Sequence, residues 1–252
     1  MNRYIAFKLF ALTCLLVVFS TCAWAGGSTY SSVRTDQKVA ALTFDDGPTN
    51  PYTPEVLDIL KKHGVKATFF VTGENAHAHP ALLKRMMAEG HEIGNHTWNH
   101  PMMKFKSAKY IRDQIERTDE AIRAAGYTGT IHFRCPYGLR PAALPLVLKD
   151  MGKEHILFSV DPTDWRKPSA STITKRILNQ TRPGAFVLMH DGGGNRSHTV
   201  AALDGVIDGL KAKGYSFVTV QEMLDLRTEN KPAEHESAKE AVPQNTPQPI
   251  AK

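Results

Sequence analysis

Two neighbouring carboxylates in the sequence have the right types and placement for metal binding and proton transfer. Asp45 and Asp46 follow the apolar run 39–42 and precede Gly47 and Pro48. This pattern predicts a strand that ends in two acids and a turn. One carboxylate could hold a metal ion while the other moves a proton. An Asp-Asp pair before Gly-Pro is more often a simple turn, so the pair alone does not decide between chemistry and structure.

Two histidines four residues apart, His96 and His100, form the second chemical feature. If their segment is helical they share one face and can present two imidazoles to one metal ion. Two histidines with one aspartate are a common open ligand set that leaves positions for water and substrate. A pair of surface or core histidines is the alternative interpretation of the same spacing.

Three later segments place polar residues at or after the ends of expected strands. Arg134 can pair with a carboxylate and keep it ionised and oriented. Asp164 can orient and charge a histidine, and the neighbouring Trp165 can wall an apolar pocket. His190 precedes the glycines 192–194 and is placed as a general acid. Each has an ordinary structural explanation, namely a salt bridge, a cap or a core histidine, but five such segments together favour a site.

The elements that must position these residues alternate regularly from Lys38 onward. We expect strands at 38–45, 66–71, 91–96, 131–134, 155–160, 184–190 and 215–218. We expect helices at 54–63, 79–89, 107–125, 141–151, 171–180, 199–213 and 220–227. Thr53 and Ser107 are the expected N-caps of the first and third helices, and Gly64 ends the first.

This alternation predicts an α/β fold with parallel strands and crossover helices. Because seven strands can be found rather than eight, we expect a distorted, incomplete (β/α) barrel of about seven parallel strands, with an open doubly wound sheet as the alternative. In a parallel barrel all carboxyl ends of the strands lie on one face, and active sites occupy that face. The five polar segments are therefore expected to meet.

The N-terminal segment predicts export. Arg3 and Lys8 precede the apolar run 9–19, and Ala23-Trp24-Ala25 is typical of a signal-peptide cleavage site. The run is short for a membrane span. We expect a secreted or periplasmic, cell-envelope protein with no stable span after cleavage, a retained anchor being the alternative. The expected organisation is a signal peptide at 1–25, a linker at 26–37, one folded domain at 38–227 and a disordered tail at 228–252.

Composition narrows the partners. Cys14 and Cys22 lie within the predicted signal peptide, so Cys135 alone remains and no internal disulfide is expected. The formal net charge is +6, and loss of Arg3 and Lys8 lowers it by two. A mildly basic balance suits an anionic wall surface. No run of Lys and Arg interleaved with aromatic residues is present, so nucleic-acid binding is not expected.

Five ordered segments resemble the motifs of the polysaccharide deacetylases, which are carbohydrate esterase family 4 with the nodulation-type deacetylase domain. The segments are Thr43–Pro48, His96–His100, Arg134–Gly138, Asp164-Trp165 and Leu188–His190. The resemblance covers about residues 36–227, and it makes 38–227 the expected catalytic domain. It implies a distorted (β/α) barrel that removes N-acetyl or O-acetyl groups from sugars. It also implies one divalent metal ion, Zn2+ first, with Co2+, Ni2+ or Mn2+ as alternatives.

The resemblance further assigns roles to the first three segments. Asp45 would be the general base, and Arg134 would orient it. Asp46, His96 and His100 would hold the metal ion.

The remaining roles concern the acid and the substrate. His190 would be the general acid, with Asp164 as its partner. The backbone N–H of Tyr137 would help to bind the oxyanion, and Trp165 and Leu188 would line the pocket for the acetyl methyl group. Cys135 departs from the family, which often has Pro or Ala there, and an exported thiol beside a metal would make the enzyme sensitive to oxidation.

The expected function is that of an exported hydrolase, acting on carbon–nitrogen bonds other than peptide bonds, that releases acetate from peptidoglycan or chitin-type N-acetylglucosamine. The expected partner is an acetylated glycan, and a monomer is expected. Three alternatives stay open: a deacetylase of O-acetylated xylan, a hydrolase of small non-sugar amides or cyclic imides on the same barrel, and a non-catalytic glycan-binding module. The export pattern disfavours the second of these, and the complete set of site residues disfavours the third.

Overall fold

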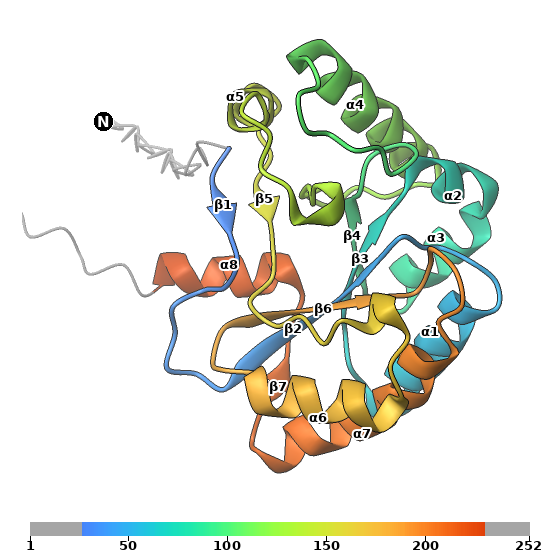
Figure 1. The fold of residues 1–252 in the computed structure, drawn as a ribbon, viewed down its shortest axis with the longest axis vertical. Coiled ribbons are helices and arrows are strands. Elements are labelled where there is room, and N and C mark those ends of the chain that lie inside the picture. The colour runs from blue at the N-terminus through green and yellow to red at the C-terminus, as the bar shows by residue number, and fades with distance from the viewer. Residues whose placement is uncertain (1–26, 230–252) are drawn as a thin grey trace, which may run out of the picture.

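A computed structural model describes residues 27–229, in which short parallel strands alternate with helices (Figure 1). The strands are β1 (Thr29–Tyr30), β2 (Val39–Asp45), β3 (Thr68–Val71), β4 (Glu92–Asn95), β5 (His155–Ile156), β6 (Ala185–His190) and β7 (Ser216–Phe217). The helices are α1 (Tyr52–His63), α2 (Gly73–Ala78), α3 (Pro80–Ala88), α4 (Ala108–Ala124), α5 (Leu144–Asp150), α6 (Ala170–Gln180), α7 (Ser197–Ala212) and α8 (Val220–Glu229), with 3-10 turns η1 (Pro136–Gly138) and η2 (Asp164–Arg166).

The two ends of the chain lie outside this description. The expected signal peptide and residues 230–252 of the expected tail are not among the described residues, whereas residues 228 and 229 belong to α8 rather than to the tail. Within residues 27–229, no helix is long and apolar enough to cross a membrane.

Strand β2 is the centre of the sheet. It pairs in parallel with β3 on one side and β6 on the other, and β4 follows β3. Strand β7 pairs with the first residues of β2, and β1 pairs with β5. All seven residues of β2 are buried because the strand is covered on both faces, as is usual in parallel sheets.

The barrel is distorted where single bridges replace full ladders. The expected strand 131–134 is wrong: Phe133 alone bridges Asn95 and His155. Backbone hydrogen bonds reach both neighbours only around this residue, and the chain then turns into η1. The expected strand 155–160 likewise shortens to β5, followed by a lone bridge from Val160 to Val187. The predicted distorted, incomplete barrel is therefore confirmed, although its strands are not the predicted set.

Three local predictions need correction. Part of the expected linker 26–37 is folded, since β1 pairs with β5 and Val33 is buried. Helix α2 follows β3 and was not expected from the sequence. Helix α1 begins at Tyr52, so Thr53 lies inside it and is not its N-cap; its hydroxyl donates instead to Asp191 Oδ2 at 2.5 Å. The other expected cap is confirmed, because Ser107 Oγ accepts a hydrogen bond from Tyr110 N at the start of α4.

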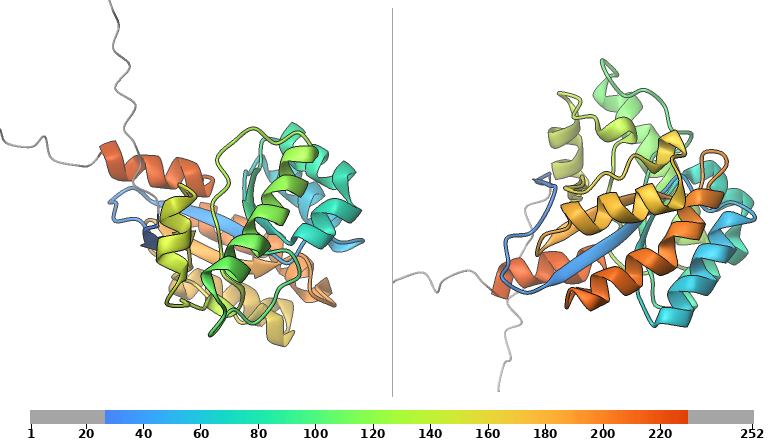
Figure 2. Two further views of the ribbon diagram at one scale, coloured as in Figure 1. Left: turned by 90° about the horizontal axis from the view of Figure 1, so that it is seen from above. Right: turned by 60° about the horizontal axis from the view of Figure 1, so that its bottom comes forward.

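The core consists of two main clusters on opposite faces of the sheet. Side chains on one strand point alternately to opposite sides. Leu42 and Phe44 of β2 join the cluster formed with the surrounding helices, whereas Val39 and Ala41 join a smaller cluster that α8 closes at the amino-terminal ends of the strands. Helices α6 and α7 pack side by side over the first cluster (Figure 2, right). With the amino-terminal end closed, the carboxyl ends of the strands are left for a site.

Candidate active site

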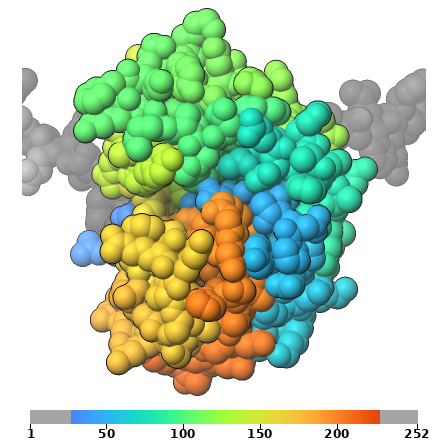
Figure 3. All heavy atoms as spheres, turned by 45° about the vertical axis from the view of Figure 1, so that its right-hand side comes forward, coloured from blue at the N-terminus to red at the C-terminus, as the bar shows by residue number. Residues whose placement is uncertain are grey.

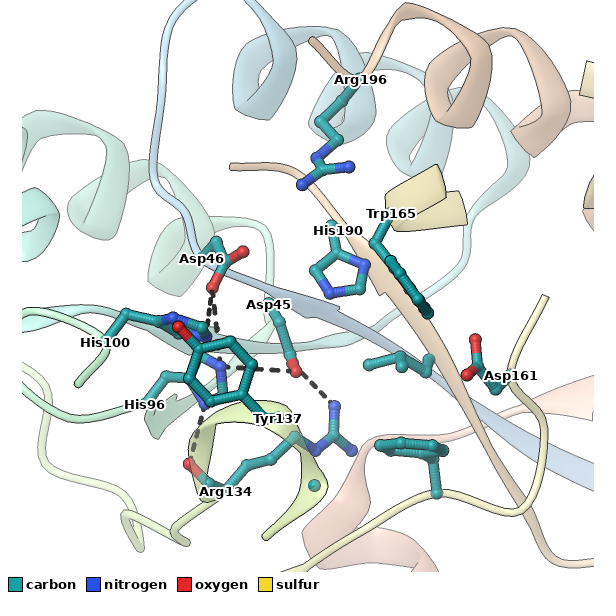
Figure 4. A pocket seen from close by; sticks show the side chains of 13 residues that line it. Asp45, Asp46, His96, His100, Arg134, Tyr137, Asp161, Trp165, His190 and Arg196 are labelled. Atoms are coloured by element: carbon teal, nitrogen blue, oxygen red, sulfur yellow. Dashed lines mark hydrogen bonds and ion pairs between the residues drawn. The ribbon is translucent and has the colours of Figure 1, made fainter. Parts of the chain in front are cut away.

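A cavity of about 420 Å3 opens at the carboxyl ends of the strands (Figure 4). It is lined by Asp45, Asp46, His96, His100, Arg134, Tyr137, Gly138, Phe158, Asp161, Trp165, Leu188, His190 and Arg196. In the space-filling view, segments far apart in the sequence meet around the hollow on this face (Figure 3). The structure thus brings the five predicted polar segments together. Asp164 stands behind His190 rather than in the cavity wall.

Asp45 is held by a buried arginine. Arg134 Nη1 donates to Asp45 Oδ1 at 2.7 Å and also to Thr43 Oγ1, while Nε and Nη2 donate to two backbone carbonyls. The guanidinium also lies over the ring of Phe70, 4.0 Å from its centroid. Burial lowers the pKa of Arg134, and the charge of Asp45 opposes that shift. An arginine with this many fixed partners has one position, so it fixes the orientation of the carboxylate.

Asp46, His96 and His100 form the one group in residues 27–229 that could hold a metal ion. Asp46 Oδ1 lies 3.6 Å from His96 Nε2 and 3.4 Å from His100 Nε2. These separations are too long for hydrogen bonds, yet they match atoms that share a tetrahedral zinc ion, which are about 3.3 Å apart. Asp46 Oδ1 is buried and has no hydrogen-bond partner among the described residues. A buried, unpartnered carboxylate oxygen between two imidazole nitrogens fits a divalent cation.

The environment of His96 prepares its Nε2 to act as a ligand. Its Nδ1 lies 2.8 Å from the carbonyl oxygen of Arg134, and a carbonyl can only accept, so Nδ1 carries the proton. Nε2 then presents a lone pair toward Asp46. Burial is the main reason that the pKa of His96 falls to about 3. The ring is therefore neutral at ordinary pH, as a metal ligand must be.

The two histidines do not share a helix, so the helical face considered in the sequence analysis is not what brings them together. The segment after β4 is a loop in which Thr97 and His100 have left-handed backbone conformations, with φ of 69° and 54°. Asn95 Oδ1 accepts from Thr97 N, and Thr97 Oγ1 accepts from His100 N. This short hydrogen-bonded turn, rather than a helical face, brings the two rings to a centroid distance of 5.0 Å.

The opposite wall of the cavity holds His190 with its carboxylate. Asp164 Oδ1 lies 2.7 Å from His190 Nδ1, while Asp164 Oδ2 accepts from His190 N and from Thr199 Oγ1. Burial alone would lower the pKa of His190, but the hydrogen bond and charge of Asp164, with the charges of Asp45 and Asp46, raise it to about 9. Burial also works against ionisation of Asp164, yet its hydrogen bonds leave its pKa below the ordinary value. The pair is therefore an imidazolium and a carboxylate.

The rest of the cavity wall is largely apolar or aromatic. Leu188 is almost fully buried, while Trp165 and Tyr137 are 45% and 59% exposed. The Tyr137 ring meets His100 edge-on at 4.6 Å. Tyr137 has a left-handed backbone with φ of 61°, and its N–H donates to no acceptor within residues 27–229. A free backbone donor in a strained turn at the edge of the cavity is suited to an anionic oxygen.

Cys135 behaves differently from the expectation of a reactive thiol. It is fully buried and belongs to an apolar cluster with residues of α4 and α5. Burial raises the pKa of its thiol to about 12. Because the thiolate is the reactive form, the structure argues against oxidation sensitivity at this position.

Sequence reasoning missed several residues of the site. Arg196 and Phe158 line the cavity, Thr43 supports Arg134, and Thr199 supports Asp164. Asp161, three residues before Asp164, also lines the cavity. For Arg196 the available indication was its position at the end of the glycine-rich segment that follows β6.

Comparison with known proteins assigns this site to a family. Residues 32–156 match the family described as polysaccharide deacetylase. A peptidoglycan-N-acetylglucosamine deacetylase of Bacillus cereus is 44% identical over 196 residues, which is 76% of this chain and 70% of the relative. The chain belongs to the polysaccharide deacetylase family. It matches a peptidoglycan-N-acetylglucosamine deacetylase of Listeria monocytogenes at 42% identity over 75% of its own length, but it spans 39% of that longer relative.

Further members of the family support both the fold and the assignment. A chitooligosaccharide deacetylase of Sinorhizobium fredii is 39% identical over 69% of this chain and 86% of the relative. Among solved structures, a peptidoglycan N-acetylglucosamine deacetylase superposes with a TM-score of 0.74 at 41% identity, covering 78% of this chain and 92% of that one. The fold and the family predicted from the five segments are thereby confirmed.

Proposed function

We propose that this polysaccharide deacetylase is an exported, metal-dependent hydrolase that removes acetyl groups from N-acetylated glycans and releases acetate. The proposal is carried by one arrangement: the ligand set of Asp46, His96 and His100 lines the same cavity as Asp45, held by Arg134, and His190, held by Asp164. A base, a metal set and a charged acid around one cavity are the parts that a metal-assisted hydrolysis of an amide uses. The named relatives make peptidoglycan N-acetylglucosamine the first candidate and chitin-type oligomers the second.

In this proposal Asp46, His96 and His100 hold one divalent ion. Two imidazoles and one carboxylate suit zinc best, with cobalt, nickel or manganese as alternatives. Such an ion supplies Lewis-acid polarisation of the acetyl carbonyl and acidification of water. The roles of the other side chains follow from their positions around it.

Asp45 acts as the general base. Arg134 occupies its Oδ1, so Oδ2, which lies 3.7 Å from His96 Nε2, is the oxygen on the side of the metal set. Oδ2 accepts the proton of the attacking water. The buried guanidinium keeps the carboxylate from rotating away during that transfer.

The backbone at Tyr137 and the His190 pair complete the reaction. The Tyr137 N–H donates to the oxyanion as the carbonyl carbon becomes tetrahedral. His190 is protonated through neutral pH because its pKa is raised to about 9, and Nδ1 is engaged by Asp164, so Nε2 delivers the proton to the leaving nitrogen. Trp165 and Leu188 surround the acetyl methyl group.

Export is supported by the N-terminal segment. Arg3, Lys8 and the apolar run 9–19 before Ala23-Trp24-Ala25 have the order of a signal peptide. A cell-envelope location agrees with a peptidoglycan substrate. We propose that the chain acts there, as a monomer.

Acetate release from defined glycans tests the proposal. The purified protein is incubated with peptidoglycan, chitooligosaccharide, poly-N-acetylglucosamine and acetylated xylan, each with and without a chelator. We expect chelator-sensitive release from the N-acetylated glycans, strongest with peptidoglycan. Release that survives complete removal of metal contradicts metal dependence, and release from acetylated xylan alone makes the protein an esterase.

A second comparison separates the amide from the ester reaction. An amine leaves only when it is protonated, whereas an alcohol leaves more readily, so amide cleavage depends more on a general acid. Replacement of His190 by alanine should therefore reduce acetate release from chitooligosaccharide far more than from acetylated xylan. Equal losses on the two substrates would remove His190 from the acid role.

A further inference from the structure

Arg196 is a buried cation that forms no salt bridge in the described part of the chain, although its charge helps to lower the pKa of Asp164. Its residue is 5% exposed, at the point where the loop after β6 enters α7. Nε donates to the carbonyl of Gly192 at 2.5 Å and Nη2 to that of Gly193 at 3.0 Å, while Nη1 is buried and has no partner. Burying a charge without an ionic partner is costly, so the position calls for a specific reason.

The loop that Arg196 holds lies directly against Asp46. A Cβ atom at Gly192 would be 2.2 Å from the backbone oxygen of Asp46. A Cβ atom at Gly193 would be 2.4 Å from Asp46 Oδ2 and 3.1 Å from Arg196 Nη2, so the carboxylate and the guanidinium flank the same glycine. Gly194, by contrast, has open space around it. Figure 4 shows Arg196 extending into the cavity from the side of His190 toward Asp46.

Asp46 has few other restraints. Asn75 Nδ2 donates to its backbone oxygen, but no side chain in residues 27–229 hydrogen-bonds to its carboxylate. Its backbone is left-handed, with φ of 73°. The contact surface of Gly192 and Gly193 is therefore what limits the movement of Oδ2 and leaves Oδ1 directed at His96 and His100.

We propose that Arg196 is a positioning residue for the metal site: it fastens the Gly192–Gly193 loop against Asp46 and so holds that carboxylate toward the two histidines. The inference rests on the metal set of the proposed function and adds a residue to it. Arg196 acts through the loop, because Nε and Nη2 are both engaged by loop carbonyls and Nη1 is buried. Loss of a contact that orients a metal ligand typically changes metal affinity 10–100-fold.

The shape of the contact explains why an arginine is needed. Two carbonyls that belong to successive residues are reached by two nitrogens of one planar group. A lysine carries the same charge at a single point and can satisfy one carbonyl at a time without the fixed fork. We therefore expect Arg196→Lys to be intermediate between the wild type and Arg196→Gln.

The inference is tested by measuring metal affinity. The full-length protein is freed of metal and titrated with Zn2+ against a competing chelator. Arg196→Gln should weaken the dissociation constant about 10–100-fold, and Arg196→Lys less. Arg182→Gln is the matched control, since Arg182 also donates to two backbone carbonyls but is exposed and far from the site. Circular dichroism and the thermal midpoint of the metal-free proteins report folding separately.

The outcomes separate the inference from the proposed function. If the wild type binds zinc and Arg196→Gln binds it within threefold as tightly, the inference fails while the proposed function stands. A wild type that binds no zinc overturns both. If Arg196→Gln is unfolded, the variant Gly193→Ala provides the test. Its methyl group would meet Asp46 Oδ2, so its metal affinity should fall. Gly194→Ala is the control, because Gly194 also has a positive φ but no atom within 4 Å of the added methyl group, so its metal affinity should not fall. Equal affinity in the two glycine variants overturns the inference.

Discussion

Two histidines, the buried His96 and the partly buried His190, stand at the carboxyl ends of strands on opposite walls of the same cavity, and their pKa values are shifted in opposite directions. His96 has a pKa lowered to about 3, and His190 has one raised to about 9. Burial lowers the pKa in both cases. The partner of Nδ1 makes the difference: a backbone carbonyl at His96 and the Asp164 carboxylate at His190.

This comparison shows how one fold gives two histidines different charge states: a neutral imidazole suited to a metal ion, and a charged imidazolium suited to act as an acid. A carbonyl fixes the ring and its tautomer without offsetting the cost of burying a positive charge. A buried carboxylate fixes the ring and also offsets that cost. Equivalent substitutions on the His96 wall and on the His190 wall of the cavity should therefore change metal binding and activity differently.

The largest contrast is expected from removing each ring. His96→Ala should lose bound metal and reduce deacetylation to background, because two ligands rarely retain the ion. His190→Ala should keep the wild-type metal content and lose activity through the missing acid. Metal analysis of the two purified variants, beside acetate release, makes the test. Unchanged metal stoichiometry in His96→Ala would remove that residue from the ligand set.

The next effect concerns the base on the His96 side. Asp45→Asn should lower turnover about 10^3-fold or more, because an amide cannot accept the proton of the attacking water. Metal should still bind, since Asp45 is outside the ligand set of Asp46, His96 and His100. Acetate release and metal content are measured together. Activity close to that of the wild type would contradict the assignment of Asp45 as the base.

A smaller effect, with a distinctive pH signature, is expected at Asp164. His190 donates its proton only while it is charged, so wild-type activity should fall as pH rises through about 9. Asp164→Asn removes the charge that raises this pKa and leaves burial, which lowers it. The alkaline limb of kcat/KM should then move to a lower pH, with activity at neutral pH reduced about 10–100-fold. An alkaline limb that stays in place would assign it to another group.

The identity of these residues was predictable, whereas much of their geometry was not. Asp45, Asp46, His96, Arg134 and His190 lie at or just after the ends of the expected strands. The rule that parallel strands share a carboxyl face places them together. The turn that brings His100 to His96 depends on two left-handed residues and on the Asn95 side chain, which spacing alone does not reveal.

Supporting residues were harder to find from the sequence for a related reason. Thr43 and Thr199 act through contacts between segments far apart in the chain, so their roles do not follow from the local sequence. Arg196 contacts the nearby Gly192, and only the approach of that loop to Asp46 gives it a place in the site. The strand expected at 131–134 does not form, because only Phe133 bridges the chain on each side, at Asn95 and His155. Whether a segment pairs over its full length depends on its neighbours and not on its own apolar character.

The smallest effect is expected at Thr43, which lies on the side of Asp45 and does not contact His190 or Asp164. Thr43 Oγ1 accepts from Arg134 Nη1 and donates to the carbonyl of Val187, so it supports the base without touching the acid. Thr43→Val should lower kcat/KM about tenfold or less, because Arg134 keeps its hydrogen bond to Asp45. The alkaline limb near pH 9 should not move, since Asp164 and His190 are unchanged.

A pH–rate profile of this variant beside Asp164→Asn makes the test. An alkaline limb that shifts in both variants would mean that the groups on the two walls titrate as one coupled unit. The contrast between His96 and His190 would then no longer rest on their separate partners.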